Sequence, residues 1–304
     1  MIGLSTAWTS FDARTGGELI NPIIDLGFGA VELEFRITGK LFQEILPRIR
    51  AHEIKVLSVH NYFPVPEILR PEQASGDCFS LSSLDREERE KGIYYTCRTI
   101  ERAHDLEARA VVLHLGRVET DLPRNRLQQL YRDGEWEAKG AELLQQEQEE
   151  RRRLRDPHLD ALLFSLDKIV KQAEQLGVVV GIENRYYLRE MPDKEEIGII
   201  LDQFRGGPVG YWHDTGHAAA FETLGIGKHE ELLKAYAPYM VGIHLHDCQG
   251  IDDHKPPGKG EIAFEMVKQY IPEQAIKIME IHPPAQGEEI LEGLAFLKEK
   301  GIKA

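Results

Sequence analysis

Short apolar runs alternate along the whole chain with longer amphipathic segments, and this alternation constrains the fold more than any other feature. Runs rich in β-branched residues are typical of buried strands, whereas the longer segments have the spacing of surface helices. Eight strands are expected, at Ile2–Ala7, Ala30–Phe35, Lys55–His60, Ala110–His114, Val178–Glu183, Val209–His213, Met240–His246 and Lys277–Ile281.

Helical segments separate these strands. They are Gly17–Leu26, Leu41–Ala51, Arg86–Leu106, Leu159–Leu176, Lys194–Phe204, Lys228–Tyr236, Ile262–Tyr270 and Gly287–Lys298. Strands that alternate regularly with helices are typical of βαβ units and of a parallel sheet. Eight such units, roughly evenly distributed over 304 residues, favour a closed (β/α)₈ TIM barrel over an open doubly wound sheet. We therefore predict an α/β barrel that occupies the chain as a single domain.

Two segments interrupt the regular alternation. Asn61–Leu84 is a proline-containing loop after the third strand, and Arg117–Asp156 is a long insertion after the fourth. Residues 136–153 of the insertion are mostly helix-forming, with Leu143 and Leu144 as the only strong apolar anchors. A charged face of this kind is usually solvent-exposed. Because both segments project from the barrel face that holds active sites, the insertion is also a candidate lid or subunit contact, only weakly held to the barrel.

The composition narrows the functional classes. The formal net charge of −14 argues against broad attraction to nucleic acid, although it leaves a local basic groove open. Cys78, Cys97 and Cys248 have no CxxC spacing, which favours a reducing cytoplasm over a disulfide-bonded secreted protein. The first residues lack the pattern of a signal peptide, and no apolar run approaches the ~20 residues of a membrane span. We predict a cytoplasmic protein without membrane contact.

Histidine, aspartate and glutamate residues stand where the predicted strands end. These candidate ligands are His60, His114, Glu183, Asp214, His217, His244, Asp252, His254 and Glu280. The carboxyl ends of the strands of a barrel meet around one mouth, so these side chains are expected to converge. Imidazole and carboxylate groups suit zinc, manganese and related divalent ions, and no thiolate accompanies them here. We therefore predict a site for one or more divalent metal ions.

Each candidate also has an ordinary structural explanation. A histidine at a strand end is more often a hydrogen-bonded polar residue than a ligand, Asp214 is placed to cap the following helix, and Asp252 is a common turn residue. Glu183 and Glu280 are harder to explain in this way, because a carboxylate that closes an apolar strand is costly to bury without a partner. The metal hypothesis therefore depends on the residues as a set.

Several stretches resemble the xylose isomerase-like TIM barrels, which include sugar isomerases, sugar epimerases and endonuclease IV-type nucleases (AP endonuclease family 2). They are Ser58-Val59-His60, Leu113-His114-Leu115-Gly116, Gly181-Ile182-Glu183-Asn184, His213-Asp214-Thr215-Gly216-His217, His244-Leu245-His246-Asp247, the run from Asp252 to Gly260, and Met279-Glu280. The DTGH stretch at 214–217 and the HxxPGxG stretch at 254–260 are the most specific.

The resemblance implies a core metal site and two outer positions. The core ligands would be Glu183, Asp214, His244 and Glu280, with the two glutamates also moving a substrate proton. Nuclease-type relatives add one metal at His60 and His114 and another at His217, Asp252 and His254. The resemblance thus implies one ion of the zinc, manganese, magnesium or cobalt class, with up to three sites open. Glu34 and Lys259 are predicted to contact substrate.

Two departures from the family patterns bear on the function. Epimerase-type members commonly have arginine where His254 stands, and the DNA-contacting loops of the nucleases have no counterpart that we can match to Thr9–Gly16 or Arg36–Lys40. The preferred hypothesis is a metal-dependent isomerase or epimerase of a small sugar or polyol, which transfers a proton next to a carbonyl group. The alternatives are a zinc-dependent phosphodiesterase acting on abasic DNA and a non-catalytic metal- or sugar-binding barrel. Nucleic acid is the less favoured partner, and a homo-oligomer remains open.

Overall fold

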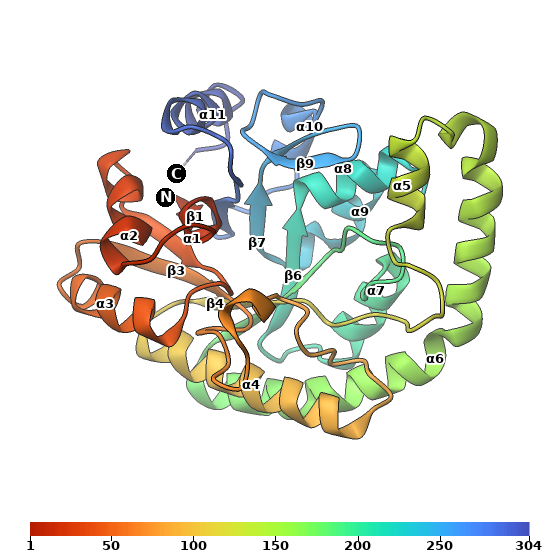
Figure 1. Cartoon of the computed structure of the whole chain (residues 1–304), viewed down its shortest axis with the longest axis horizontal. Helices are drawn as coiled ribbons and strands as arrows, with labels where there is room; N and C mark the ends of the chain where they lie inside the picture. The colour runs from red at the N-terminus through yellow and green to blue at the C-terminus, as the bar shows by residue number, and fades with distance from the viewer. Residues whose placement is uncertain (304) are drawn as a thin grey trace.

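Eight parallel strands close into a barrel in the computed structural model, which describes residues 1–303 (Figure 1). The order around the barrel is β1-β10-β7-β6-β5-β4-β3-β2. The strands are β1 (Ile2–Ser5), β2 (Ala30–Leu33), β3 (Lys55–His60), β4 (Ala110–Leu113), β5 (Val179–Glu183), β6 (Val209–Asp214), β7 (Met240–Leu245) and β10 (Ile276–Met279). Each corresponds to one of the eight expected strands, and the predicted (β/α)₈ fold is confirmed.

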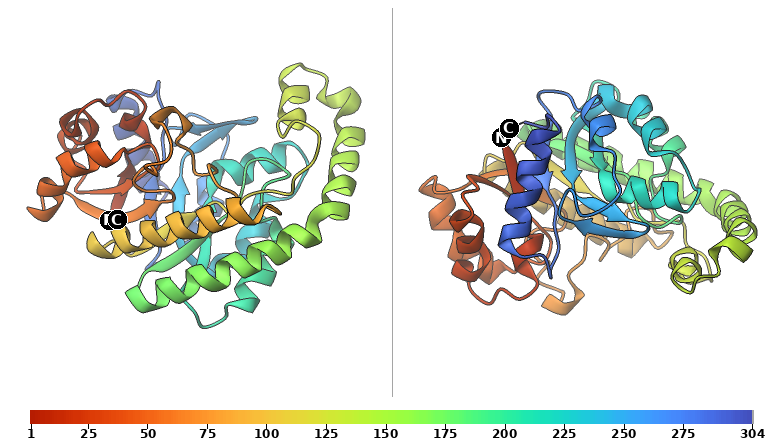
Figure 2. Two further views of the ribbon diagram at one scale, coloured as in Figure 1. Left: turned by 60° about the horizontal axis from the view of Figure 1, so that its bottom comes forward. Right: turned by 90° about the horizontal axis from the view of Figure 1, so that it is seen from above.

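Helices surround the barrel, and each predicted helical segment overlaps an observed helix (Figures 1 and 2). They are α1 (Ala7–Ser10), α2 (Gly16–Asp25), α3 (Gly39–Arg50), α4 (Arg86–Asp105), α5 (Arg126–Arg132), α6 (Trp136–Leu176), α7 (Lys194–Gln203), α8 (Thr215–Thr223), α9 (His229–Tyr236), α10 (Phe264–Lys268) and α11 (Gly287–Glu299), with 3₁₀ turns at Pro71–Gln73 and Ala237–Tyr239. No helix within residues 1–303 is both long and apolar enough to cross a membrane.

Two elements close to the mouth are absent from the eight predicted strands and the eight predicted helical segments. Helix α8 begins directly after β6, with Asp214 as its N-cap. The segment after β7 forms an antiparallel hairpin of β8 (Asp247–Gln249) and β9 (Asp252–Lys255), where no further strand was predicted. Both elements bring additional polar side chains to the carboxyl ends of the barrel strands.

Trp212 on β6 fills the barrel below the candidate ligands. Its ring is fully buried and lies 5.2 Å from the ring of His244 on β7. Glycine on the two neighbouring strands makes room for it, since a Cβ atom at Gly242 would lie 2.1 Å from the indole ring and one at Gly181 would lie 2.8 Å from it. The interior is therefore packed, and polar side chains can gather only at its upper end.

The insertion at 117–156, which we call the arm, consists of α5 and the first part of α6 and extends beyond the barrel (Figure 2). Helix α6 is 41 residues long and joins the expected insertion helix to the barrel helix that follows. Leu143 and Leu144 pack against an apolar cluster that includes Leu127, Leu188 and Ile251. The two leucines thus anchor the arm to the loops around the mouth.

Buried ion pairs, which the sequence analysis did not predict, add to this apolar contact. Arg151 of the arm is only 4% exposed. It donates hydrogen bonds to Glu196 and to Asp193, each at 2.7 Å. One turn earlier on the same face of α6, Glu147 accepts a hydrogen bond from the Nε of Arg189 at 2.8 Å. Because buried charges need partners, these pairs fix the arm to α7 and to the loop that precedes it.

Replacing Arg151 by alanine is expected to lower the free energy of unfolding by about 3 kcal/mol, because it leaves the Glu196 carboxylate buried without its cation. Arg152→Ala is the matched control, since Arg152 is an exposed residue of the same helix and should cost less than about 0.5 kcal/mol. Urea unfolding of both variants measures the difference. Equal losses would show that the buried pairs do not hold the arm.

Candidate metal centre

Four side chains at the carboxyl ends of separate strands meet at the centre of the mouth. Glu183 ends β5, Asp214 ends β6, His244 lies on β7 and Glu280 follows β10. The Nδ1 atom of His244 is 2.9 Å from a carboxylate oxygen of Glu183, 2.9 Å from one of Glu280 and 3.6 Å from one of Asp214. All four are buried, with one potential ligand atom of each within 4.8 Å of the others. The structure thus brings together the predicted core quartet.

The pKa values of this quartet reflect burial opposed by close charges of the other sign. Burial raises the pKa of Glu183, but hydrogen bonds from His114, His244 and His60 outweigh it and hold that pKa well below its usual range. Burial likewise lowers the pKa of His244, but the carboxylates of Glu280 and Glu32 outweigh it and raise that pKa well above normal. A cluster of buried carboxylates around one imidazole is therefore an environment that favours positive charge.

Glu32 on β2 is a buried member of the site that the sequence analysis missed. Its two carboxylate oxygens lie 3.0 and 3.2 Å from Nε2 of His244, and Ser58 donates to it at 2.8 Å. Glu32 thereby directs Nδ1 of the imidazole toward the other three carboxylates, in the way that carboxylates orient metal-binding histidines. The signal was present in the sequence, because Glu32 interrupts the apolar run Ala30–Leu33.

His60 and His114 flank the quartet on the side of β3 and β4. The Nε2 atom of His114 lies 2.9 Å from Glu183 and that of His60 lies 3.7 Å from it. With Glu183 they form a second group able to hold a metal ion. Burial and Arg185 both lower the pKa of His114, but Asp77 and Glu183 raise it to about 9.

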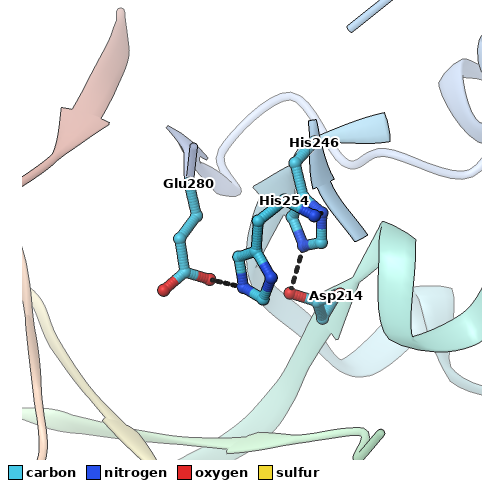
Figure 3. A group of neighbouring side chains, drawn as sticks. All are labelled: Asp214, His246, His254 and Glu280. Atoms are coloured by element: carbon cyan, nitrogen blue, oxygen red, sulfur yellow. Dashed lines mark hydrogen bonds and ion pairs between the residues drawn. The ribbon is translucent and has the colours of Figure 1, made fainter. Parts of the chain in front are cut away.

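Histidines from α8 and β9 flank the quartet on the other side. His217, Asp253 and His254 form a third group of potential ligands. A fourth group, shown in Figure 3, consists of Asp214, His246, His254 and Glu280. In it, Nε2 of His246 lies 2.8 Å from Asp214, and the ring of His246 stacks on that of His254 at 4.3 Å. Asp214 also caps α8, since its other oxygen accepts a hydrogen bond from the amide of His217 at 2.7 Å.

A family model for the xylose isomerase-like TIM barrel matches residues 21–300 of the chain. The chain belongs to the xylose isomerase-like TIM barrel family. The resemblance inferred from the strand-end motifs is thereby confirmed. A search by sequence among curated proteins found no match.

Solved structures of this family have the same fold at low sequence identity. A D-tagatose 3-epimerase-like protein is 20% identical with a TM-score of 0.69, and the match covers 98% of this chain and 96% of that one. D-psicose 3-epimerase from Clostridium cellulolyticum is 14% identical with a TM-score of 0.66, covering 99% of both chains. A Thermus thermophilus protein soaked with ZnCl₂ is 22% identical with a TM-score of 0.61, covering 100% of this chain and 99% of that one.

The donor set of this xylose isomerase-like barrel fits a divalent metal ion. The core offers three carboxylates and one imidazole without any thiolate, a combination suited to zinc, manganese, cobalt or magnesium. The fit also has an electrostatic basis, because a bound cation would offset the negative charge of buried carboxylates that the surrounding histidines balance only in part.

Asp252 does not join the third group, contrary to the prediction, and Asp253 lies there instead. The side chain of Asp252 is 66% exposed and lies 3.8 Å from Arg132, whereas Asp253 contacts His254 at 3.0 Å. In a regular strand, residues 252 and 254 would point to the same face. His254 has a φ of 55°, in the left-handed region, and this local change of direction brings neighbouring residues 253 and 254 to the same side.

We expect Asp253→Asn and Asp252→Asn to have different effects on metal content. The amide at position 253 removes a negative charge next to His217 and His254, so any ion bound there should be held about tenfold more weakly. The same change at 252 alters only an exposed side chain. Metal titration of the two variants makes the comparison, and a greater loss at 252 would contradict the arrangement.

Neither predicted substrate contact reaches the mouth directly. Lys259 is a surface residue whose ammonium pairs with Glu292 on α11 at 2.8 Å. Glu34 is buried and accepts hydrogen bonds from the backbone and side chain of Arg36, both at 2.8 Å. Burial raises the pKa of Glu34, while Arg36 opposes that rise. Glu34 therefore orients Arg36, and Arg36 is the residue that lines the cavity at the mouth.

Proposed function

We propose that the chain is a divalent-metal-dependent isomerase or epimerase of a small sugar or polyol derivative. The observation that carries the proposal is the position of Glu183 and Glu280. Glu183 ends β5 and Glu280 follows β10, two strands that are three places apart in the barrel, yet a carboxylate oxygen of each lies 2.9 Å from the same nitrogen of His244. Two carboxylates that approach one point from different strands can serve the two faces of a bound carbon atom.

The two glutamates would move the proton. The pKa of each lies well below its usual range, because histidines outweigh the effect of burial at both positions. Each is thus a carboxylate at neutral pH and available as a base. In an isomerisation, one carboxylate would accept the proton from carbon and return it to the neighbouring carbon, while the hydroxyl proton moves to the former carbonyl oxygen. In an epimerisation, the first carboxylate would take the proton from one face, and the second glutamate, after it takes up a proton from solvent, would deliver that proton to the opposite face.

The remaining residues would bind and orient. Glu183, Asp214, His244 and Glu280 would hold the metal ion, whose positive charge stabilises negative charge that develops on substrate oxygens. Glu32 fixes the orientation of the His244 imidazole through its contact with Nε2. The cavity at the mouth has a volume of about 370 Å³, which suits a small molecule. The sugar epimerases among the structural neighbours agree with this substrate class.

Exchange with solvent deuterium tests the proposal. The Mn²⁺-loaded protein is incubated in D₂O with ketoses and with inosose-like polyols, and carbon-bound deuterium is followed by NMR. We expect deuterium next to the carbonyl carbon of at least one substrate, because a carboxyl proton exchanges with water between transfer steps. Conversion of a substrate without any incorporation would contradict transfer through Glu183 and Glu280.

A multinuclear phosphodiesterase acting at abasic DNA is the second candidate. It is favoured by the groups of potential ligands outside the core. His60 and His114 form one group with Glu183 of the core, and His254 of the third group lies 3.7 Å from Glu280. The net charge of −14 opposes it. Metal analysis separates the two proposals: we expect one tightly held ion per chain. Three zinc ions together with cleavage of an abasic oligonucleotide would replace our proposal with the second one.

A further inference from the structure

Two of the arginines that line the mouth cavity lie closer to solvent than its carboxylates. Glu183, Glu190 and Glu280 are buried, Asp77 and Asp253 are 17% and 21% exposed, and the buried Arg185 lies 3.3 Å from Glu183. The guanidinium groups of Arg124 and Arg132 lie at its rim, and these side chains are 50% and 49% exposed. Both arginines belong to the arm. A ligand that enters from solvent therefore meets arginines first, although the chain as a whole has a net charge of −14.

Arg124 and Arg132 have N–H donors that no acidic side chain within residues 1–303 occupies at hydrogen-bond distance. The closest carboxylate to Arg124 is that of Glu190 at 3.7 Å, and the closest to Arg132 is that of Asp252 at 3.8 Å. Both distances exceed that of a hydrogen bond, so within residues 1–303 neither guanidinium is saturated by an acidic partner. Arg36 completes the rim from the turn after β2, where it lies over the ring of Phe11 at 3.8 Å.

The arm holds its arginines at fixed positions over the site. Gln128 on α5 donates a hydrogen bond to the carbonyl of Tyr186 at 3.2 Å, and the hydroxyl of Tyr186 donates to the carbonyl of Ile251 at 2.6 Å. Arg124 lies over the ring of Tyr187 at 4.8 Å. Figure 1 shows α5 next to α8. These contacts fix the backbone that carries the arginines, and the ring of Tyr187 restricts Arg124, so Arg124 loses less conformational entropy when it binds a ligand.

We propose that Arg124, Arg132 and Arg36 bind an anionic group of the substrate, a phosphate monoester or a carboxylate, while its sugar portion reaches Glu183 and Glu280. The inference rests on the proposed function, because it names the substrate class of that same site. Guanidinium groups match both anions through paired N–H···O bonds. The limited cavity and the acidic surface favour a small acidic sugar derivative over a polynucleotide.

Calorimetry on the Mn²⁺-loaded full chain tests this inference. The probes are D-fructose, D-fructose 6-phosphate and D-fructuronate, with inorganic phosphate as a probe that does not depend on the sugar. At least one charged sugar should bind about tenfold more tightly than D-fructose. In the double variant Arg124→Ala, Arg132→Ala, the ratio of the affinities for the charged sugar and for D-fructose should fall about tenfold, to near one, and the affinity for phosphate should weaken in parallel. The charged sugar with the greater loss identifies the anionic group.

Arg152→Ala is the matched control, because Arg152 is an exposed arginine of the arm that does not line the mouth cavity. It should leave the ratio within about twofold of the parent value. The inference is overturned if the folded double variant keeps the parent ratio. It is also overturned if an abasic oligonucleotide shows a larger arginine-dependent loss than either charged sugar.

The same experiment separates this inference from the proposed function. Arginine-dependent anion binding without any solvent deuterium exchange would support the anion site and contradict the isomerase proposal. Deuterium exchange into D-fructose with no effect of the two arginines would support the isomerase proposal and overturn the anion site.

Discussion

Replacing Glu183 by glutamine should lower kcat at least about a thousandfold, and Glu280→Gln should have a comparable effect. Glutamine keeps the shape of the side chain and one oxygen ligand, but its amide does not accept a proton at neutral pH. The loss should therefore appear in kcat, with a smaller change in KM. Steady-state kinetics on the substrate that exchanges deuterium, together with metal analysis of each variant, separate lost proton transfer from lost metal.

His60→Ala provides the comparison for this experiment. His60 lies 3.7 Å from Glu183, at the edge of the quartet, so its loss should reduce turnover much less than either glutamate variant. An equal loss of activity, accompanied by the loss of one metal equivalent, would contradict a single-metal mechanism. It would favour the multinuclear phosphodiesterase.

Removal of the metal by chelation should abolish turnover and lower the melting temperature by roughly 5 °C or more. An ion bound only by the folded state stabilises that state by mass action, by about 2.7 kcal/mol at a free concentration one hundred times its Kd. Differential scanning calorimetry before and after chelation measures the shift, and added metal should reverse it.

Asp214→Asn and Asp252→Asn form a matched pair for the chelation experiment. The first removes a buried carboxylate of the quartet, so chelator should then have little further effect on the melting temperature. The second alters an exposed carboxylate and should leave the response to chelator intact. Full turnover and an unchanged melting temperature in the metal-free parent protein would contradict metal dependence.

The barrel and the convergence of its ligands could be predicted because both follow from local patterns. Apolar runs determine the strands, and the closed parallel sheet brings residues at the strand ends to one mouth. This was sufficient to expect that Glu183, Asp214, His244 and Glu280 converge with the other candidates at the strand ends, whereas the choice of these four as the core came from the family resemblance. Glu32 could also have been found, because the argument about a buried carboxylate in an apolar run applies to it equally.

Other features depend on geometry that no local pattern carries. The exchange of Asp252 for Asp253 follows from the left-handed backbone at His254, a conformation that non-glycine residues seldom adopt. Arg151 and Glu196 are 45 residues apart in the chain, and their buried pairing depends on where the arm comes to rest. The prediction that Lys259 contacts substrate differs from the structure for a similar reason. Its partner Glu292 lies 33 residues away in the chain, on the outer face of α11.

Anomalous diffraction from crystals of the Mn²⁺- or Zn²⁺-loaded protein tests the central claim most directly. Data collected above and below the absorption edge of the metal give its position without reference to the protein atoms. We predict the strongest peak among Glu183, Asp214, His244 and Glu280, within ligand distance of all four. A fully loaded protein with no peak at this position, and with its metal bound elsewhere, would contradict the account.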